Sequence, residues 1–219
     1  MRRLLTVVFC FHLFVGIAIA STTKTYPIFR FRIGEVKLAM KTPTGFCAPM
    51  GLDLAQADAL SRADERNLTV ANLLACNRNP TVNPWSNYIL IKAPKFAIHT
   101  TVPKSDSLAQ LDIEMQKPKD PNLDRKLTES IANSTEKNLG TRVEMQMEWQ
   151  YSGRDADCVY MSGPVSAKTD LSERSGQLAT CMTVVGGRFF AVHLYEFPAT
   201  SSLEALKAQV HRIATSVHP

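Results

Sequence analysis

The sequence predicts an α+β protein in which an antiparallel sheet, formed mainly by a C-terminal meander, is covered by helices and ends in a closing amphipathic helix. Three observations predict this class. Residues 143–151 alternate strictly between apolar and polar side chains, which is typical of a strand with one buried face. Gly186-Gly187 separates two apolar runs and favours a two-residue hairpin turn. Residues 201–217 carry apolar side chains at helical spacing.

The first twenty residues have the three parts of a secretory signal peptide. They open with two arginines, continue as an uncharged apolar run and close on Ala18-Ile19-Ala20. An uncleaved membrane anchor is the alternative, because the run approaches the length of a bilayer span. The polar residues that begin at Ser21 favour cleavage after Ala20. We therefore expect residues 1–20 to be a signal peptide and residues 21–219 to form a single α+β domain without a membrane span.

The N-terminal third predicts strands and one helix. Residues 26–40 alternate around Gly34 and indicate two short strands joined by a bend. Residues 51–66 indicate a helix with Asp53 as its cap. Its apolar side chains fall on one side and are Leu54, Ala57 and Leu60. Residues 87–102 indicate a central strand, with room for a second one after it.

Two helices are expected in the middle of the chain. Residues 105–117 place Leu108, Leu111 and Met115 at helical spacing. Residues 120–140 are expected to form the second helix. They have proline at the first helical position and glycine at the C-terminal end, as is common in helices.

The last third predicts four strands and the closing helix. The strands are residues 143–151, two segments on either side of the loop 164–175, and residues 188–197. Ser201 and Glu204 fit a capping box at the start of the helix. An apolar stripe that should lie on the sheet follows, formed by Leu203, Leu206, Val210, Ile213 and Val217.

Four cysteines remain after cleavage of the signal, and an even number in an oxidising compartment favours disulfides. A zinc site or a redox pair would require a spacing such as C-x-x-C, which the sequence does not contain. Cys158 and Cys181 are equally far from the centre of a predicted hairpin, so we expect them to face each other and to be joined. Cys47 then pairs with Cys76.

The region from Thr141 to Val217 resembles the PsbP-like fold, which periplasmic DcrB-type proteins share. The residues that carry the resemblance are VVGGRFFAVHLYEFPATSSLEALKAQVHRIATSV, in which a last strand and a short loop lead into a helix. Residues 45–76 are similar to a group of uncharacterised exported bacterial proteins with a Gly-aromatic-Cys motif and a later cysteine after a Leu-Leu pair. The PsbP-like resemblance implies binding or assembly roles and brings no catalytic residue with it.

No pattern of catalytic, cofactor-binding or metal-ligating residues is present in the sequence. A Gly-x-Ser-x-Gly elbow and a phosphate-binding loop are both missing. The four histidines after the signal, His99, His193, His211 and His218, are dispersed: His193 is expected to be half-buried in a strand with Glu196 on the opposite face, His211 to face solvent, and His218 to be disordered. Glu144 and Glu148 share the wet face of one strand. The net charge of +5 includes two arginines of the signal, and no dense basic cluster indicates nucleic-acid binding.

We therefore expect an exported, periplasmic or secreted protein that is not an enzyme and that binds a partner protein or an envelope component. One version is an immunity protein that neutralises a toxin. The alternative is a hydrolase of envelope polymers whose site is assembled from scattered residues. A pocket with a histidine and a carboxylate within hydrogen-bond reach favours the hydrolase, and an exposed apolar patch without such a pair favours the binding protein.

Overall fold

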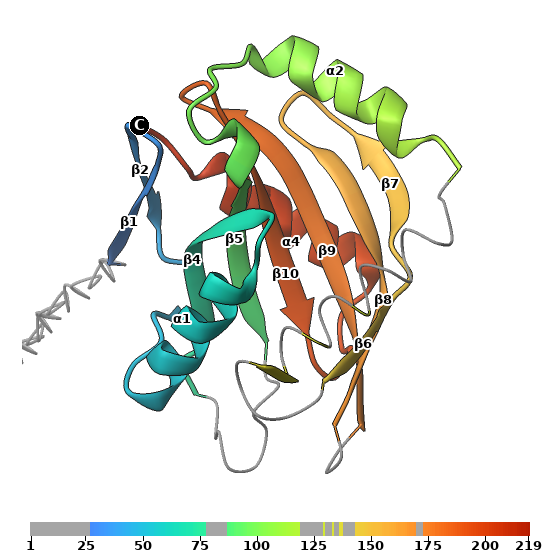
Figure 1. The fold of residues 1–219 in the computed structure, drawn as a ribbon. Coiled ribbons are helices and arrows are strands. Elements are labelled where there is room, and N and C mark those ends of the chain that lie inside the picture. Colours follow the sequence, from blue (N-terminus) through green and yellow to red (C-terminus); the bar gives the residue numbers. More distant parts are fainter. Residues whose placement is uncertain are drawn as a thin grey trace, which may run out of the picture.

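The structure, a computed structural model, describes residues 27–77, 87–118, 143–169 and 173–219, together with the helical residues Glu129, Asn133, Glu136 and Lys137. The predicted signal peptide and most of the helix predicted at 120–140 lie outside the described residues. The α+β class is confirmed: Figure 1 shows a curved sheet with the C-terminal helix behind it and further helices in front of it and at its upper edge.

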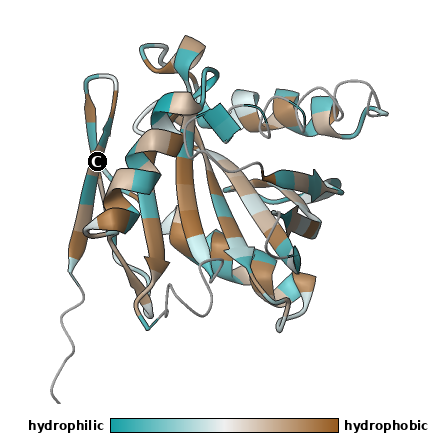
Figure 2. Ribbon diagram, turned by 60° about the horizontal axis from the view of Figure 1, so that its bottom comes forward, coloured by the Kyte–Doolittle hydropathy of each residue, from teal (hydrophilic) through white to brown (hydrophobic). Residues whose placement is uncertain are grey.

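One antiparallel sheet contains eight strands and includes the predicted C-terminal meander. Seven of them follow the spatial order β3 (Phe46–Cys47), β4 (Asn67–Ala75), β5 (Tyr88–Pro94), β10 (Arg188–Glu196), β9 (Glu173–Val185), β8 (Val159–Lys168) and β6 (Glu144–Met147), and β7 (Gln150–Arg154) also pairs with β8. Hydrophobic residues dominate the central strands in Figure 2. The core therefore lies where these strands meet the C-terminal helix.

The predicted single strand at 143–151 is divided into β6 and β7, although its alternating burial is retained. The division lies opposite Pro164, which has no N–H to donate to a neighbouring strand. The Glu148 N–H donates to the Pro164 carbonyl at 3.1 Å. The Glu148 carbonyl comes so close to Gly163 that a Cβ atom there would lie 2.0 Å from it. A kink between the two short strands is the result.

The hairpin of β8 and β9 is longer than the sequence indicates, and its register differs. Most of the predicted loop at 164–175 is strand, since pairing continues to Lys168 and Glu173. Tyr160, not Cys158, lies opposite Cys181. The expected register was wrong by two residues because Cys158 belongs to the turn that precedes β8.

Strands β1 (Ile28–Ile33) and β2 (Val36–Lys41) form a separate two-stranded antiparallel sheet around Gly34, as predicted. Gly34 has a positive φ of 56°. The expectation that His218 is disordered was wrong, because its backbone N–H and C=O both pair with Ala39 at 2.9 and 2.8 Å. The chain end is therefore bound to the edge of β2.

Helix α4 (Leu203–Thr215) packs its apolar stripe against the sheet, as predicted. The stripe begins at Leu206, since Leu203 is 38% exposed. Each fully buried aliphatic side chain contributes about 1.5–3 kcal/mol. The helix cap is Ser202, whose side chain accepts from the Ala205 N–H at 3.2 Å. Ser201 was the wrong choice because its hydroxyl and its amide both donate to Glu196.

Among the elements that the structure describes in full, two further helices and a short 3-10 turn connect strands along the chain. Helix α2 (Lys104–Met115) is the predicted middle helix and buries Leu108. It contacts β7 through the Tyr151 hydroxyl, which donates to Asp112 at 2.5 Å. The second strand considered within 87–102 is replaced by the turn η1 (Lys95–Ala97). Helix α1 (Leu52–Ala63) is confirmed, but its N-cap is Gly51 and not Asp53.

Candidate functional site

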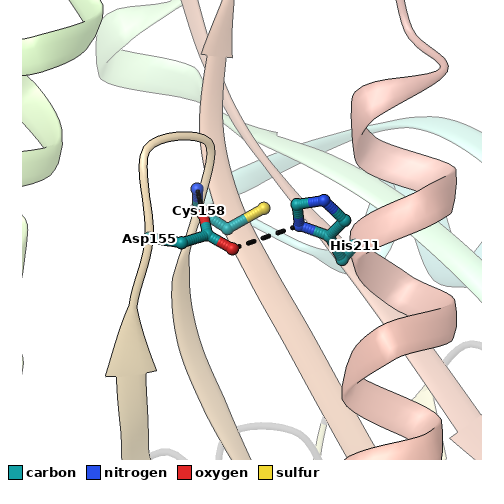
Figure 3. Close-up of side chains that lie close together, drawn as sticks. All are labelled: Asp155, Cys158 and His211. Carbon is teal, nitrogen blue, oxygen red and sulfur yellow. Dashed lines mark hydrogen bonds and ion pairs between the residues drawn. The ribbon is translucent and has the colours of Figure 1, made fainter.

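A recess of about 340 Å³ lies between α4 and the turn that joins β7 to β8. Figure 3 shows Asp155 and Cys158 of the turn facing His211 of α4. The residues that line the recess are Asp155, Tyr160, Glu204, Lys207, Ala208, His211 and Arg212. The expectation that His211 faces solvent was wrong, because its side chain is 34% exposed and is held in a hydrogen-bond network.

The turn fixes the position of the Asp155 carboxylate. One of its oxygens, Oδ1, accepts from the backbone N–H groups of Asp157 at 2.8 Å and Cys158 at 2.7 Å. The other oxygen, Oδ2, accepts from the Tyr160 hydroxyl at 2.5 Å. Burial alone would raise the Asp155 pKa, but these hydrogen bonds and the nearby His211 outweigh burial and lower it. The carboxylate is therefore ionised at neutral pH.

The hydrogen bonds determine which nitrogen of His211 carries the proton. Tyr160 has one hydroxyl proton, and it is directed to Asp155. The Nδ1 atom of His211 lies 2.6 Å from the Tyr160 oxygen and 3.3 Å from Asp155 Oδ2, so Nδ1 must be the donor. Neutral His211 thus holds its proton on Nδ1 and leaves Nε2 as the basic nitrogen. Burial and the Asp155 carboxylate raise the Tyr160 pKa and keep its hydroxyl protonated.

A lysine completes this arrangement. Lys207 Nζ lies 5.0 Å from the centre of the Tyr160 ring and donates to the Ser152 carbonyl at 2.7 Å. These contacts place a cation over the ring face, where the aromatic quadrupole attracts it. The recess therefore combines one ordered cation with the Asp155–Tyr160–His211 network.

Asp155, Cys158 and His211 each bring one potential metal-ligand atom within 4.8 Å of the others. The sulfur of Cys158 is bonded to Cys181, so it is not available as a thiolate ligand. One carboxylate and one imidazole remain, with the Tyr160 hydroxyl between them. A structural zinc site would need four ligands, which this set does not supply.

Removing the Tyr160 hydroxyl is expected to loosen the contact between α4 and the β7–β8 turn. Tyr160→Phe should destabilise the protein by about 1–2 kcal/mol, because His211 Nδ1 and Asp155 Oδ2 each lose a partner. Thermal unfolding at pH 7 checks the loss, and ¹⁵N NMR of His211 checks the tautomer. If Nδ1 is unprotonated in the wild-type protein, the assignment of donors is wrong.

Both disulfides are present with the pairing that the sequence predicts. Cys47 and Cys76 have a Cα–Cα distance of 5.1 Å, and Cys158 and Cys181 one of 5.3 Å. Cys158 and Cys181 are fully buried in the core, whereas Cys47 and Cys76 are exposed. Two disulfides are typical of proteins in oxidising, exported environments. No helix within the described parts of the chain has the length and apolar character needed to cross a membrane.

The remaining histidine and carboxylates of the sequence analysis do not join the recess. His193 is 9% exposed, lies 3.0 Å from the Thr180 hydroxyl and stacks on Trp149. Burial, with a smaller effect of Lys92, lowers the His193 pKa to about 3, so the ring is neutral. Glu144 and Glu148 are both exposed, as expected of a wet face.

A second candidate surface is helix α1, which buries none of its residues. The predicted apolar side is present but is not covered by the sheet. Within the helix, the exposed fractions are 84% for Leu52, 46% for Leu54 and 42% for Leu60, and Met50, just before the N-cap, is 79% exposed. We call these four residues the α1 patch. The helix lies within the loop that Cys47–Cys76 closes, so the disulfide fixes both ends of the segment that carries it.

Comparison with solved structures yields a similarity of fold. No protein-family model matches the chain, and no curated protein is significantly similar in sequence. The solution structure of the cyanobacterial PsbP protein CyanoP from Synechocystis is similar in fold, with a TM-score of 0.41 and 12% sequence identity, over 93% of this chain and 95% of that chain. This is the PsbP-like resemblance that the sequence indicates. No function is carried across from it.

Sequence reasoning missed the recess because its residues come from separate elements. Asp155 and Tyr160 are near each other in the chain, but His211 is 51 residues beyond Tyr160. One signal was available: His211 follows the stripe residue Val210 and lies four positions after Lys207, on the flank of an amphipathic helix. Nothing in the sequence indicated which strand that flank meets.

Proposed function

We propose that this protein is an exported periplasmic binding protein without enzymatic activity, and that it binds a partner protein through the α1 patch. The observation that carries the proposal is a helix with no buried residue and three exposed large apolar side chains, to which Met50 just before the helix adds a fourth. Apolar side chains gathered on one exposed element mark interaction sites more often than single exposed residues do.

Two properties of α1 support a protein partner. Charged residues of the helix, among them Asp58 and Arg62, are exposed beside its apolar side chains, and a mixture of apolar and polar groups is typical of protein–protein interfaces. The disulfide at the base of the loop restricts α1 before binding. An ordered helix loses less conformational entropy on association than a free loop does. A toxin neutralised in the periplasm is one partner of this kind.

The hydrolase is the second candidate, and the recess meets the criterion set for it, so the binding proposal rests on the α1 patch and on the lack of a nucleophilic side chain among the residues described around the recess. His211 and Asp155 lie within hydrogen-bond reach, and Nε2 of His211 is free to accept a proton. The described residues that line the recess include no serine, threonine or free thiol, so His211 would have to activate water. A hydrolase of this kind predicts that His211→Gln abolishes cleavage of envelope polymer fragments. The binding proposal predicts no such cleavage by the wild-type protein.

Charging the α1 patch is expected to abolish partner binding without loss of folding. We expect Leu54→Asp with Leu60→Asp to weaken the complex at least a hundredfold, because two carboxylates would be desolvated at the centre of the interface. The unfolding temperature should stay the same, since neither side chain is buried. The partner is identified by photo-cross-linking from position 56 of α1, and its affinity for purified protein is then measured by calorimetry.

Ile113→Asp is the matched control, because Ile113 is 57% exposed on α2. This variant should bind the partner as the wild-type protein does. The proposal is wrong if Ile113→Asp weakens the complex as much as the α1 variant, or if the α1 variant binds normally.

A further inference from the structure

The outward face of the β1–β2 sheet collects four cations. The antiparallel register places Arg30 opposite Ala39, Arg32 opposite Lys37, and Ile28 opposite Lys41, all on one face. The four charged side chains are exposed. The other face is covered by the core, where Phe31, Ile33, Leu38 and Met40 are buried. We call Arg30, Arg32, Lys37 and Lys41 the basic face.

Little within the described residues neutralises this face. Arg32 pairs with Glu35 at 3.3 Å, but both side chains are mostly exposed, and an exposed pair of this kind contributes little. Arg30, Lys37 and Lys41 have no acidic partner in the described parts of the chain. Two cations directly opposite each other on neighbouring strands, as Arg32 and Lys37 are, destabilise a sheet. An anion placed over the face would relieve this repulsion.

The shape of the face favours an extended anionic surface over a small ligand. Three of the cations, Arg30, Arg32 and Lys37, also line a groove of about 500 Å³ that reaches round to Phe31 and Leu38 of the other face and to Pro219. Ile28, at one end of the face, is 49% exposed. Cations beside an exposed aliphatic side chain suit a membrane interface, where phosphates lie above acyl chains.

The position of the basic face in the sequence also favours a membrane as the partner. Only six residues separate the apolar run that ends at Ala20 from Pro27, where the described structure begins. The run is expected to engage the membrane during export. The basic face would therefore lie close to lipid headgroups until cleavage after Ala20, and Figure 1 shows β1 and β2 at one edge of the molecule.

We propose that the basic face binds the phosphate groups of anionic phospholipids and holds the exported protein at a membrane surface. Arginine and lysine donate charge-assisted hydrogen bonds to phosphate oxygens. Each cation near an anionic bilayer strengthens binding about fivefold, and the effect decays within a Debye length. The inference does not depend on the α1 patch or on the identity of the partner.

The test uses protein recovered from the envelope fraction and vesicles of phosphatidylglycerol and phosphatidylcholine. The test variant is Arg30→Gln with Lys37→Gln. The control is Lys117→Gln with Arg174→Gln, which removes the same charge from exposed positions just after α2 and on β9. Both share the N-terminal segment of the wild-type protein, so any difference between them arises from the basic face. Binding is measured by co-sedimentation at several salt concentrations.

We expect wild-type protein and the control to bind anionic vesicles alike, and the basic-face variant to bind on the order of twentyfold more weakly. Binding should fall as salt is raised. The proposal is overturned if vesicles of phosphatidylcholine alone bind the wild-type protein equally well, or if the control variant loses as much affinity. It is also overturned if the wild-type protein does not bind anionic vesicles and instead binds an acidic protein through the basic face.

Discussion

Replacing Glu196 with glutamine is expected to destabilise the protein by about 2–3 kcal/mol at pH 7. Glu196 is 5% exposed, and its carboxylate accepts five hydrogen bonds. The donors are the backbone N–H and the hydroxyl of Thr200, the backbone N–H and the hydroxyl of Ser201, and the Gln177 amide, at 2.6–3.0 Å. These bonds fix the loop that connects β10 to α4, and an amide side chain cannot accept all five.

The same residue should make the protein sensitive to acid. Burial alone would raise the pKa of Glu196, but its hydrogen bonds lower the pKa from 4.5 to about 2. Because the folded-state pKa lies below the unfolded one, the carboxylate stabilises the fold fully above pH 4.5. This stabilisation, about 3 kcal/mol, is lost as the pH falls from 4.5 to about 2. Glu196→Gln should remove this part of the pH dependence.

Urea unfolding of both proteins between pH 2 and pH 7 measures the difference. The stability gap between wild type and Glu196→Gln should be largest at pH 7, narrow as the pH falls below 4.5 and close near pH 2. Glu148→Gln, at an exposed position, is the control and should change stability by no more than about 0.5 kcal/mol. A gap that is constant across this range would show that Glu196 does not act as a charged acceptor.

The parts of the fold that sequence predicts well are those with a strong local period. The apolar stripe of α4 and the alternation of apolar and polar residues at 143–151 each indicate which face is buried. The structure shows both patterns of burial. Strand β4 was missed because Asn67–Ala75 shows no clean alternation, and its pairing shifts at a bulge between Thr69 and Ala71. Without β4, the position of α1 between two paired strands was not visible.

The candidate sites depend on register, which the sequence leaves open. The basic face was missed because its cations are spread over residues 30–41 and gather only when Arg32 lies opposite Lys37. The recess was missed because its residues come from separate elements, and the hairpin register was wrong because Tyr160, not Cys158, lies opposite Cys181. A shift of two residues keeps every side chain on its face, so the hydrophobic pattern cannot distinguish the two registers.

The two disulfides are expected to stabilise the protein to different extents although their loops are of similar length. The bonds span 29 residues for Cys47–Cys76 and 23 for Cys158–Cys181, and restriction of the unfolded chain gives about 3–4 kcal/mol for either. Cys158 and Cys181 are also fully buried under α4, so alanine at both positions leaves a cavity that costs about 1–2 kcal/mol more. Cys158→Ala with Cys181→Ala should therefore be the less stable double variant.

Function should respond in the opposite order. Below its melting temperature, the Cys158→Ala, Cys181→Ala variant should bind the partner as the wild-type protein does, because neither sulfur has a chemical role. The Cys47→Ala, Cys76→Ala variant should bind more weakly, because the loop that carries α1 is no longer closed. Mild reduction of the folded protein should have the same effect, since only the Cys47–Cys76 bond is exposed to the reductant.

Peptide mapping under non-reducing conditions, urea unfolding and partner calorimetry test these expectations together. Equal stability of the two double variants would mean that the buried pair acts through the unfolded chain alone. A Cys47–Cys158 linkage, or four free thiols in the exported protein, would refute the pairing. If removal of Cys47–Cys76 leaves partner affinity unchanged while the α1 patch is still required, the helix is ordered by its own contacts, and the exposed disulfide contributes stability alone.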